Sequence, residues 1–384
     1  MVTQTLAFTK CGKPKNVKGE GFRCRIRPSH ALYNRTYRMA STVFHGNPAA
    51  QVRETGDVRS EFEALLSGCG FYDLSSRVKI ALTGGDRVRW LNGMVTNNIR
   101  DLAAGRGVYA FLLNPQGHIL GDLYAYNQGE SLMIDSDQFQ SEKLLATFDH
   151  YIIMDDVEVA NVSGKLSAIG VTGPKSREVL RAAGFEVPNL EPLQFVDVTR
   201  QNVGMTLVRG DNASVESYEL WLSPDQVTSI RDALRSAGAM PVCPNALELL
   251  RIAAGIPRYG QDIRERDLPQ ETEQQRALHF SKGCYIGQEI VERIRSRGNV
   301  HRKFTGFAVE GALPDVGTKI QADGRDIGEI TSVASLPFAS GERSVALGYI
   351  RRELATLGKQ FQVGATRLSI AALPFSEVFR HEDL

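Results

Sequence analysis

The chain has 384 residues, enough for two or three domains, and an ordinary globular composition: 42% hydrophobic and 23% charged residues, with a net charge of +1. Residues 1–38 carry nine Lys or Arg and one acid, so the sequence from Met39 onward holds 36 basic and 43 acidic residues. This acidic balance argues against stable binding of nucleic acid, and no stretch approaches the ~18 uninterrupted apolar residues of a membrane span.

Residues 1–45 are predicted to form a basic, disordered N-terminal extension. Three interpretations stay open: a disordered arm, an Arg-rich organellar transit peptide, or translated sequence upstream of a start at Met39. The five cysteines are odd in number and have no metal-ligand spacing, which favours a reducing compartment over a disulfide scaffold or a zinc site. We therefore expect a cytoplasmic protein without a metal, or an organellar matrix protein if the extension is a transit peptide.

Two similar units follow along the chain. "VKIALTGGDRVRWLNGMVTNNI" (residues 78–99) predicts a strand, a Thr-Gly turn and a helix, and "LSAIGVTGPKSREVLRAAGF" (residues 166–185) repeats the plan 89 residues later. The repetition favours two duplicated α+β subdomains.

Between these units, residues 107–126 read as two strands joined by the turn Asn114-Pro115-Gln116-Gly117. Asp122 lies in the second strand, on the same side as Tyr124, although Asp is uncommon inside strands. Its carboxylate must be solvated, paired, or used to hold an N–H group of a ligand. An edge-strand acid facing water and a ligand contact are the two interpretations.

Two further charged side chains stand in apolar patterns. Glu219 alternates with Tyr218 and Trp221 in a predicted strand, and Arg251 lies in an otherwise apolar helix that begins at Pro244 and breaks at Gly255. A guanidinium in such a helix needs a buried partner, so a structural ion pair and a ligand contact are both open for Arg251.

The stretch "SKGCYIGQEIVERIRSRG" (residues 281–298) predicts a helix that ends at Gly298, with Cys284 just before its start. A helix N-terminus and the nearby ammonium of Lys282 both favour a thiolate. The alternative is a small buried cysteine. Tyr285 would wall a pocket, and Gln288 would hold the loop through its backbone. After Gly298, short strands with turn signals predict a β-barrel of about 80 residues.

The octapeptide "KGCYIGQE" (residues 282–289) resembles the signature of YgfZ-type folate-binding proteins, a lineage of iron–sulfur cluster assembly factors related to the glycine-cleavage T-protein, an aminomethyltransferase. The resemblance covers roughly residues 60–375. "GHILGDLYAY" is similar to the T-protein segment that carries a folate-facing acid, here Asp122. "SYELWL" places Glu219 on the family's pterin-holding glutamate, and "LLRIAAGIPRYGQDI" keeps an arginine as Arg251 and a tyrosine as Tyr259.

Two T-protein motifs are changed. The Gly-Tyr-Thr-Gly-Glu loop is absent, since residues 210–214 read Gly-Asp-Asn-Ala-Ser, and Arg-Leu-Glu-Ala has become Arg-Ile-Ala-Ala at residues 251–254. These departures weigh against aminomethyl transfer and leave a folate pocket in place.

The resemblance implies an α+β fold of three parts: two mixed subdomains around a folate channel in residues 46–300, and a C-terminal β-barrel in residues 301–384. It implies tetrahydrofolate as the cofactor, held by Asp122, Glu219, Arg251, Tyr259, Lys282, Tyr285 and Gln288, with Cys284 and Asp122 as the reactive groups.

The function that the resemblance implies is a monomeric tetrahydrofolate-binding protein that assists iron–sulfur cluster assembly or repair. Its partners would be iron–sulfur proteins or their assembly machinery, and it would thereby support enzymes such as those that modify tRNA. The alternative is a folate-dependent one-carbon transferase of aminomethyl type.

Overall fold

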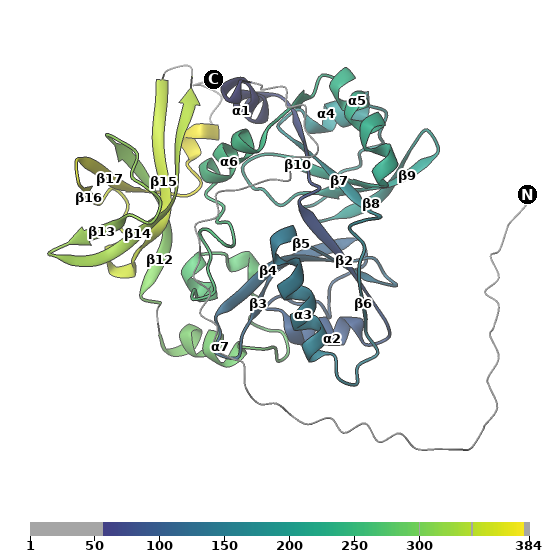
Figure 1. The fold of residues 1–384 in the computed structure, drawn as a ribbon, viewed down its shortest axis with the longest axis horizontal. Coiled ribbons are helices and arrows are strands. Elements are labelled where there is room, and N and C mark those ends of the chain that lie inside the picture. Colours follow the sequence, from purple (N-terminus) through teal and green to yellow (C-terminus); the bar gives the residue numbers. More distant parts are fainter. Residues whose placement is uncertain (1–56, 299, 339–340, 380–384) are drawn as a thin grey trace, which may run out of the picture. The chain divides into compact units, whose positions relative to one another are not determined.

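The computed structural model describes residues 57–298, 300–338 and 341–379, and the predicted extension at residues 1–45 lies outside them (Figure 1). The first subdomain holds β2 (Arg77–Thr83), α2 (Arg87–Met94), β3 (Arg106–Leu113), β4 (Ile119–Asn127), β5 (Leu132–Asp137), α3 (Ser141–Tyr151) and β6 (Glu158–Asn161). The second holds β7 (Ser167–Thr172), α4 (Ser176–Ala182), β8 (Phe195–Arg200), β9 (Val203–Arg209), β10 (Ser217–Leu222), α5 (Val227–Ser236) and β11 (Met240–Pro241). The two subdomains therefore repeat one order of elements.

The two sheets also repeat one strand order. The first runs β3-β4-β5-β2-β6 and the second β8-β9-β10-β7-β1-β11, where β1 (Gly70–Asp73) is inserted before the last strand. Both strand-to-helix turns need glycine: φ is +96° at Gly84 and +135° at Gly173. A Cβ on Gly84 would lie 2.1 Å from a backbone oxygen, and one on Gly173 would lie 2.4 Å from another. The duplication predicted from the Thr-Gly turns is thus present in the structure.

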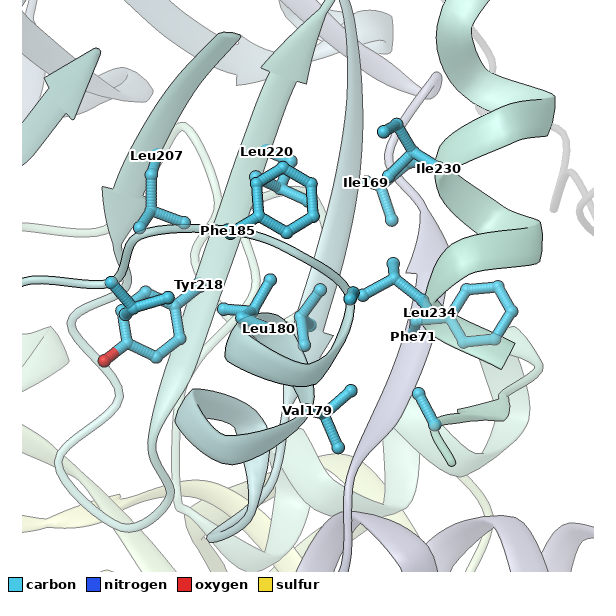
Figure 2. Close-up of a cluster of buried hydrophobic side chains, with 14 of the residues drawn as sticks. Phe71, Ile169, Val179, Leu180, Phe185, Leu207, Tyr218, Leu220, Ile230 and Leu234 are labelled. Carbon is cyan, nitrogen blue, oxygen red and sulfur yellow. The ribbon is translucent and has the colours of Figure 1, made fainter. Parts of the chain in front are cut away.

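Each sheet buries its apolar face against its own two helices. In the first subdomain, α2 and α3 cover β2, β4 and β5. Figure 2 shows the second core, where side chains of α4 and α5 point toward β1, β7, β9 and β10. Its labelled members are Phe71, Ile169, Val179, Leu180, Phe185, Leu207, Tyr218, Leu220, Ile230 and Leu234. Each sheet therefore has a hydrophobic core of its own.

The C-terminal strands form a third sheet, β13-β14-β15-β12-β17-β16, whose end strands β13 and β16 come together, so that it is a nearly closed barrel. Its strands are β12 (Arg302–Glu310), β13 (Lys319–Ala322), β14 (Arg325–Phe338), β15 (Gly341–Arg351), β16 (Gln360–Val363) and β17 (Thr366–Ala371). The domain boundaries predicted at residues 45 and 300 stay predictions.

The barrel shares a hydrophobic core with two helices, α1 (Val58–Ser67) and α6 (Pro244–Ala253). Phe62 and Leu250 meet Leu336, Leu347 and Tyr349 of β14 and β15 there. The remaining elements are α7 (Gln288–Arg297) and short 3-10 helices at Gln138–Gln140, Pro224–Gln226, Pro269–Thr272, Gln275–Ala277, Arg352–Leu354 and Ser376–Phe379. No helix in the described part of the chain has the length and hydrophobicity needed to cross a membrane.

Candidate functional site

A cavity of about 200 Å³ lies between strands β3 and β4 of the first subdomain and the segment that follows α6. Its walls are mostly charged and aromatic, in contrast to the apolar walls of an empty packing defect. The lining residues are Arg77, Tyr109, Asp122, Leu123, Tyr124, Asp137, Arg251, Ile256, Pro257, Arg258, Tyr259 and Arg276.

Asp122 is one of two half-buried carboxylates that line this cavity, the other being Asp137. Its Oδ2 accepts a hydrogen bond from the hydroxyl of Tyr109 at 2.7 Å, and its Oδ1 accepts one from Nε2 of Gln140 at 2.8 Å. Burial raises the pKa of Asp122 above its ordinary 3.8; the Gln140 hydrogen bond opposes this shift, and the charge of Asp137 adds to it. The carboxylate is therefore held in place and made more basic than a solvated one.

Aromatic rings and guanidinium groups form most of the remaining cavity wall. Tyr109 and Tyr124 lie side by side with ring centroids 5.0 Å apart, and Cζ of Arg276 stands 4.4 Å from the centroid of the Tyr109 ring. Arg77 is bound to Asp135 and, at 3.2 Å, to Asp137. The cavity thus offers flat apolar surfaces, one basic carboxylate and cationic groups whose charges are largely paired.

Arg251 lines the cavity, but all its donors are already used. Its five N–H groups bond to Glu248 (2.9 and 2.6 Å), to the carbonyl of Ile256 (2.7 Å), to Asp262 (2.7 Å) and to Ser332 (2.8 Å). Asp262 is the buried partner that the sequence predicts for this guanidinium. Arg251 shapes the cavity wall, and a direct hydrogen bond to a ligand would require it to exchange one of these partners.

Tyr259 is a buried wall residue whose hydroxyl is also engaged. It donates to the carbonyl of Leu120 and accepts from Nζ of Lys143 at 2.9 Å. Its ring stacks on Phe139, with centroids 6.2 Å apart. Tyr259 contributes a ring face and a fixed position to the cavity.

Glu219 lies outside the group of residues that line the cavity. Its Oε2 accepts from Nε1 of Trp221 at 2.8 Å and stands 3.6 Å from Nζ of Lys79, a buried ammonium that is also 2.9 Å from Asp135. Asp135 in turn binds Arg77 on the cavity wall. Glu219 is connected to the cavity through this chain of charges, and its predicted role in holding a pterin stays a prediction.

The signature stretch forms a loop followed by α7 (Gln288–Arg297), so three residues separate Cys284 from the helix. α7 begins at Gln288, so Ile286 and Cys284 precede it, and Gly298 ends it as predicted. Gly287 turns the chain with φ +80°, where a Cβ would lie 2.6 Å from the carbonyl oxygen of Asn114. This left-handed glycine ends the loop, and the helix starts at the next residue.

Lys282 is buried and points into the first subdomain. Its Nζ donates to the carbonyl oxygens of Asn92, Val95 and Asn97, each at 2.6 Å. Burial lowers the pKa of Lys282 to about 7, and Arg100 contributes to the shift in the same direction. The ammonium predicted to activate Cys284 instead holds the backbone at the end of α2.

Replacing Lys282 by methionine is expected to lower the free energy of unfolding by about 3 kcal/mol, because three carbonyls lose their hydrogen-bond donor while the apolar stem is kept. Urea denaturation of the full chain measures this loss. Lys175→Met, at an exposed lysine, is the matched control and should stay within about 0.5 kcal/mol of the parent. Equal stability of Lys282→Met and the parent would show that the three hydrogen bonds of Lys282 do not stabilise the fold.

Cys284 is exposed, in contrast to the buried Cys69, whose thiol pKa burial raises to about 11. Cys284 lies outside the group of residues that line the cavity. Gln288 holds the loop as proposed, since its Oε1 accepts from the backbone N–H of Tyr285 at 3.3 Å. The ring of Tyr285 packs on the apolar cluster that contains Tyr109 and Tyr259. The signature loop therefore rests on the outer side of the cavity wall.

The structure brings Asp122, Arg251 and Tyr259 together at one cavity, and the other predicted site residues lie outside its lining: Glu219, Lys282, Cys284, Tyr285 and Gln288. Sequence reasoning missed several further residues of the site: Arg77, Tyr109, Asp137, Gln140 and Arg276. Tyr109 lies directly opposite Tyr124 in the structure, because a bulge in β4 shifts the register of the hairpin. Within the described residues, no three His, Cys, Asp or Glu side chains are grouped so that they could hold a metal ion.

Comparison with known proteins gives consistent matches. Residues 29–282 match the GCVT N-terminal domain, and residues 302–379 match the glycine cleavage T-protein C-terminal barrel domain. An aminomethyltransferase of Halothermothrix orenii is 27% identical over 332 residues, which cover 82% of this chain and 90% of that protein. One of Nostoc is 27% identical over 319 residues, which cover 80% and 83%.

The structure resembles that of the glycine cleavage system aminomethyltransferase T from Bartonella henselae, with a TM-score of 0.74 and 22% identity over 83% of this chain and 89% of that one. This likeness confirms the predicted α+β fold with its C-terminal barrel. The narrower YgfZ-type assignment stays a prediction. Because both domain models of the family match and the fold agrees, the chain belongs to the glycine cleavage T-protein family.

Proposed function

We propose that the cavity binds tetrahydrofolate and that the protein transfers a one-carbon unit of aminomethyl type with it. The observation that carries the proposal is Asp122, a carboxylate that is fixed by Tyr109 and Gln140 and faces a cavity with aromatic walls. Membership of the T-protein family and relatives named aminomethyltransferase support the same activity.

The chemistry of the cavity fits one end of a reduced folate. A pterin ring has flat faces, which suit Tyr109 and Tyr124, and several N–H groups, which suit a carboxylate such as Asp122. The volume of about 200 Å³ is below the range of roughly 300–1,000 Å³ that encloses a drug-sized ligand. The cavity would therefore hold the ring end and leave the rest of the folate outside.

Asp122 would act as the base of the transfer. Its carboxylate accepts the proton of a folate amine while the electron pair of that nitrogen forms the new bond to the one-carbon donor. The bond between that carbon and its previous carrier breaks as the new bond forms, and the departing group leaves with the electron pair and takes up a proton. The raised pKa of Asp122 suits this role, because a more basic carboxylate takes the proton more readily.

One observation favours a second candidate, a tetrahydrofolate-binding factor for iron–sulfur cluster assembly. Cys284 is exposed, belongs to the signature octapeptide, and has no part in the transfer just described. The changed motifs at residues 210–214 and 251–254 also weaken the case for aminomethyl transfer. In this candidate the folate cavity supports a reaction at the Cys284 thiol, and the partners are iron–sulfur proteins.

The variant Cys284→Ala, together with the activity of the parent, separates the candidates. The transferase proposal expects Cys284→Ala to keep folate-dependent turnover in formaldehyde and glycine-cleavage assays. The second candidate expects no turnover by the parent, and loss of complementation of an iron–sulfur-dependent growth defect by Cys284→Ala with a melting temperature unchanged within about 2 °C. Ser281→Ala, at a neighbouring exposed position, is the control for both assays. An inactive parent that still requires Cys284 for growth would reject the transferase.

A further inference from the structure

Asp262 is a fully buried carboxylate whose acceptor sites are all occupied. Its Oδ1 accepts from the hydroxyl of Thr331 and, at 2.7 Å, from that of Ser332. Its Oδ2 accepts from Nη1 of Arg251 at 2.7 Å and from the backbone N–H of Arg258 at 2.9 Å. Two of these donors belong to the barrel and two to the cavity wall, so one carboxylate joins the two parts.

The barrel can supply two adjacent hydroxyls because β14 contains a β-bulge. Ile330 pairs with Gly348 and Ser332 with Leu347, which leaves Thr331 as an extra residue in the strand. In a regular strand, neighbouring side chains point to opposite faces of the sheet. The bulge turns both Thr331 and Ser332 toward Asp262, and it buries both side chains.

On the other side, Asp262 closes the turn that forms one wall of the cavity. The carbonyl of Arg258 accepts from the backbone N–H groups of Asp262 at 2.8 Å and Ile263 at 3.0 Å. Ile256, Arg258 and Tyr259 of this turn all line the cavity. Asp262 also fixes Arg251, which in turn bonds to the carbonyl of Ile256 at 2.7 Å. The wall is therefore held at both ends by groups that depend on Asp262.

We propose that Thr331 and Ser332 of the barrel are positioning residues of the ligand cavity, acting through Asp262 on the wall at residues 256–263. The inference rests on the proposed function for the identity of the ligand. The barrel is then part of the folate site without touching it. Loss of the bulge hydroxyls loosens the wall and weakens binding, even though the residues that contact the ligand are unchanged.

A purely structural role would affect stability alone, so the test needs a control that costs stability elsewhere in the barrel. Thr366 provides it: its side chain is buried, and its hydroxyl donates to the carbonyl of Ala312 at 2.7 Å. Thr331→Val and Thr366→Val both remove one buried hydroxyl and keep the shape of the side chain. Thr331→Ser keeps the hydroxyl that Thr331→Val removes.

Two measurements are made on the full chain of each variant: hydrogen exchange of the amides in residues 256–263, and the Kd of tetrahydrofolate. Thr331→Val is expected to speed exchange in this segment and to raise the Kd about fivefold or more, the low end of a coupling between sites. Thr331→Ser should restore both values, and Thr366→Val should leave both within about twofold of the parent. The same changes in Thr366→Val, or none in Thr331→Val, would overturn the proposal. A parent that fails to bind tetrahydrofolate rejects the proposed function, and the exchange data then decide the positioning role alone.

Discussion

Asp262→Ala is expected to lower the free energy of unfolding by about 3–5 kcal/mol, because it removes one of the two carboxylates, Asp262 and Glu248, that pair with the buried guanidinium of Arg251. The hydroxyls of Thr331 and Ser332 lose an acceptor in the same step. A whole domain is stable by only about 5–15 kcal/mol, so this one change should bring unfolding close to physiological temperature. Thermal unfolding followed by circular dichroism measures the effect.

A surface pair provides the control for this change. Asp232 faces Arg235 at 3.6 Å on α5, and both side chains are more than half exposed. Asp232→Ala should shift stability by less than about 1 kcal/mol, because water replaces the lost partner. Similar losses in Asp232→Ala and Asp262→Ala would contradict the view that Asp262 joins the barrel to the cavity wall.

The second large effect is expected for Asp122→Asn, which keeps the size of the side chain and removes the base. Folate-dependent turnover should fall by about 10²–10⁴-fold, the usual contribution of a positioned general base. The parent should show a rate that rises with pH along an acid limb above pH 3.8, because the raised pKa keeps Asp122 protonated at lower pH. This limb should be absent from the pH profile of Asp122→Asn.

Stability changes with pH in the opposite direction to the rate. The folded protein holds the Asp122 proton more tightly than the unfolded chain, so the contribution of this group to stability falls as the pH rises above 3.8. Asp137→Asn is the matched control, since it removes the same charge from the cavity and keeps the base. Its acid limb should move to lower pH, because Asp137 helps to raise the pKa of Asp122. An unchanged limb in both variants would show that another group is the base.

Local sequence patterns were sufficient to predict the two repeated subdomains. The two Thr-Gly turns require a positive φ at Gly84 and Gly173, and this backbone requirement is local and visible in the residue type. The barrel was predicted from turn signals for the same reason. The duplication of whole subdomains followed from these two turns, although strand β1, inserted in the second sheet, had no such signal.

The cavity was harder to predict because a bulge changes the register of its hairpin. Counting from the turn at Asn114 would set Asp122 opposite Ala110. The extra residue Leu120 in β4 shifts the pairing, so that Asp122 faces Phe111 and Tyr124 faces Tyr109. Leu120 uses its carbonyl to accept hydrogen bonds from Tyr259 and Lys143. These partners come from distant parts of the chain, so no local pattern reports them.

Lys282 shows the same limit in the signature stretch. Proximity in sequence suggested that its ammonium would act on Cys284, but three backbone carbonyls about 190 residues away in the chain accept its protons. Asp262 had no signal in the sequence either, because its partners lie on β14 and on the turn it closes. Tertiary contacts decide the roles of both side chains.

Titration calorimetry of tetrahydrofolate into the full chain tests whether the cavity binds this ligand. Both the transferase and the iron–sulfur assembly factor require that binding. We expect saturable one-to-one binding by the parent. In Asp122→Asn the Kd should be about 10–100-fold higher, since a charge-assisted hydrogen bond worth about 1.5–3 kcal/mol is lost. No binding by the parent, or equal affinity of the parent and Asp122→Asn, would contradict the assignment of this cavity as the folate site.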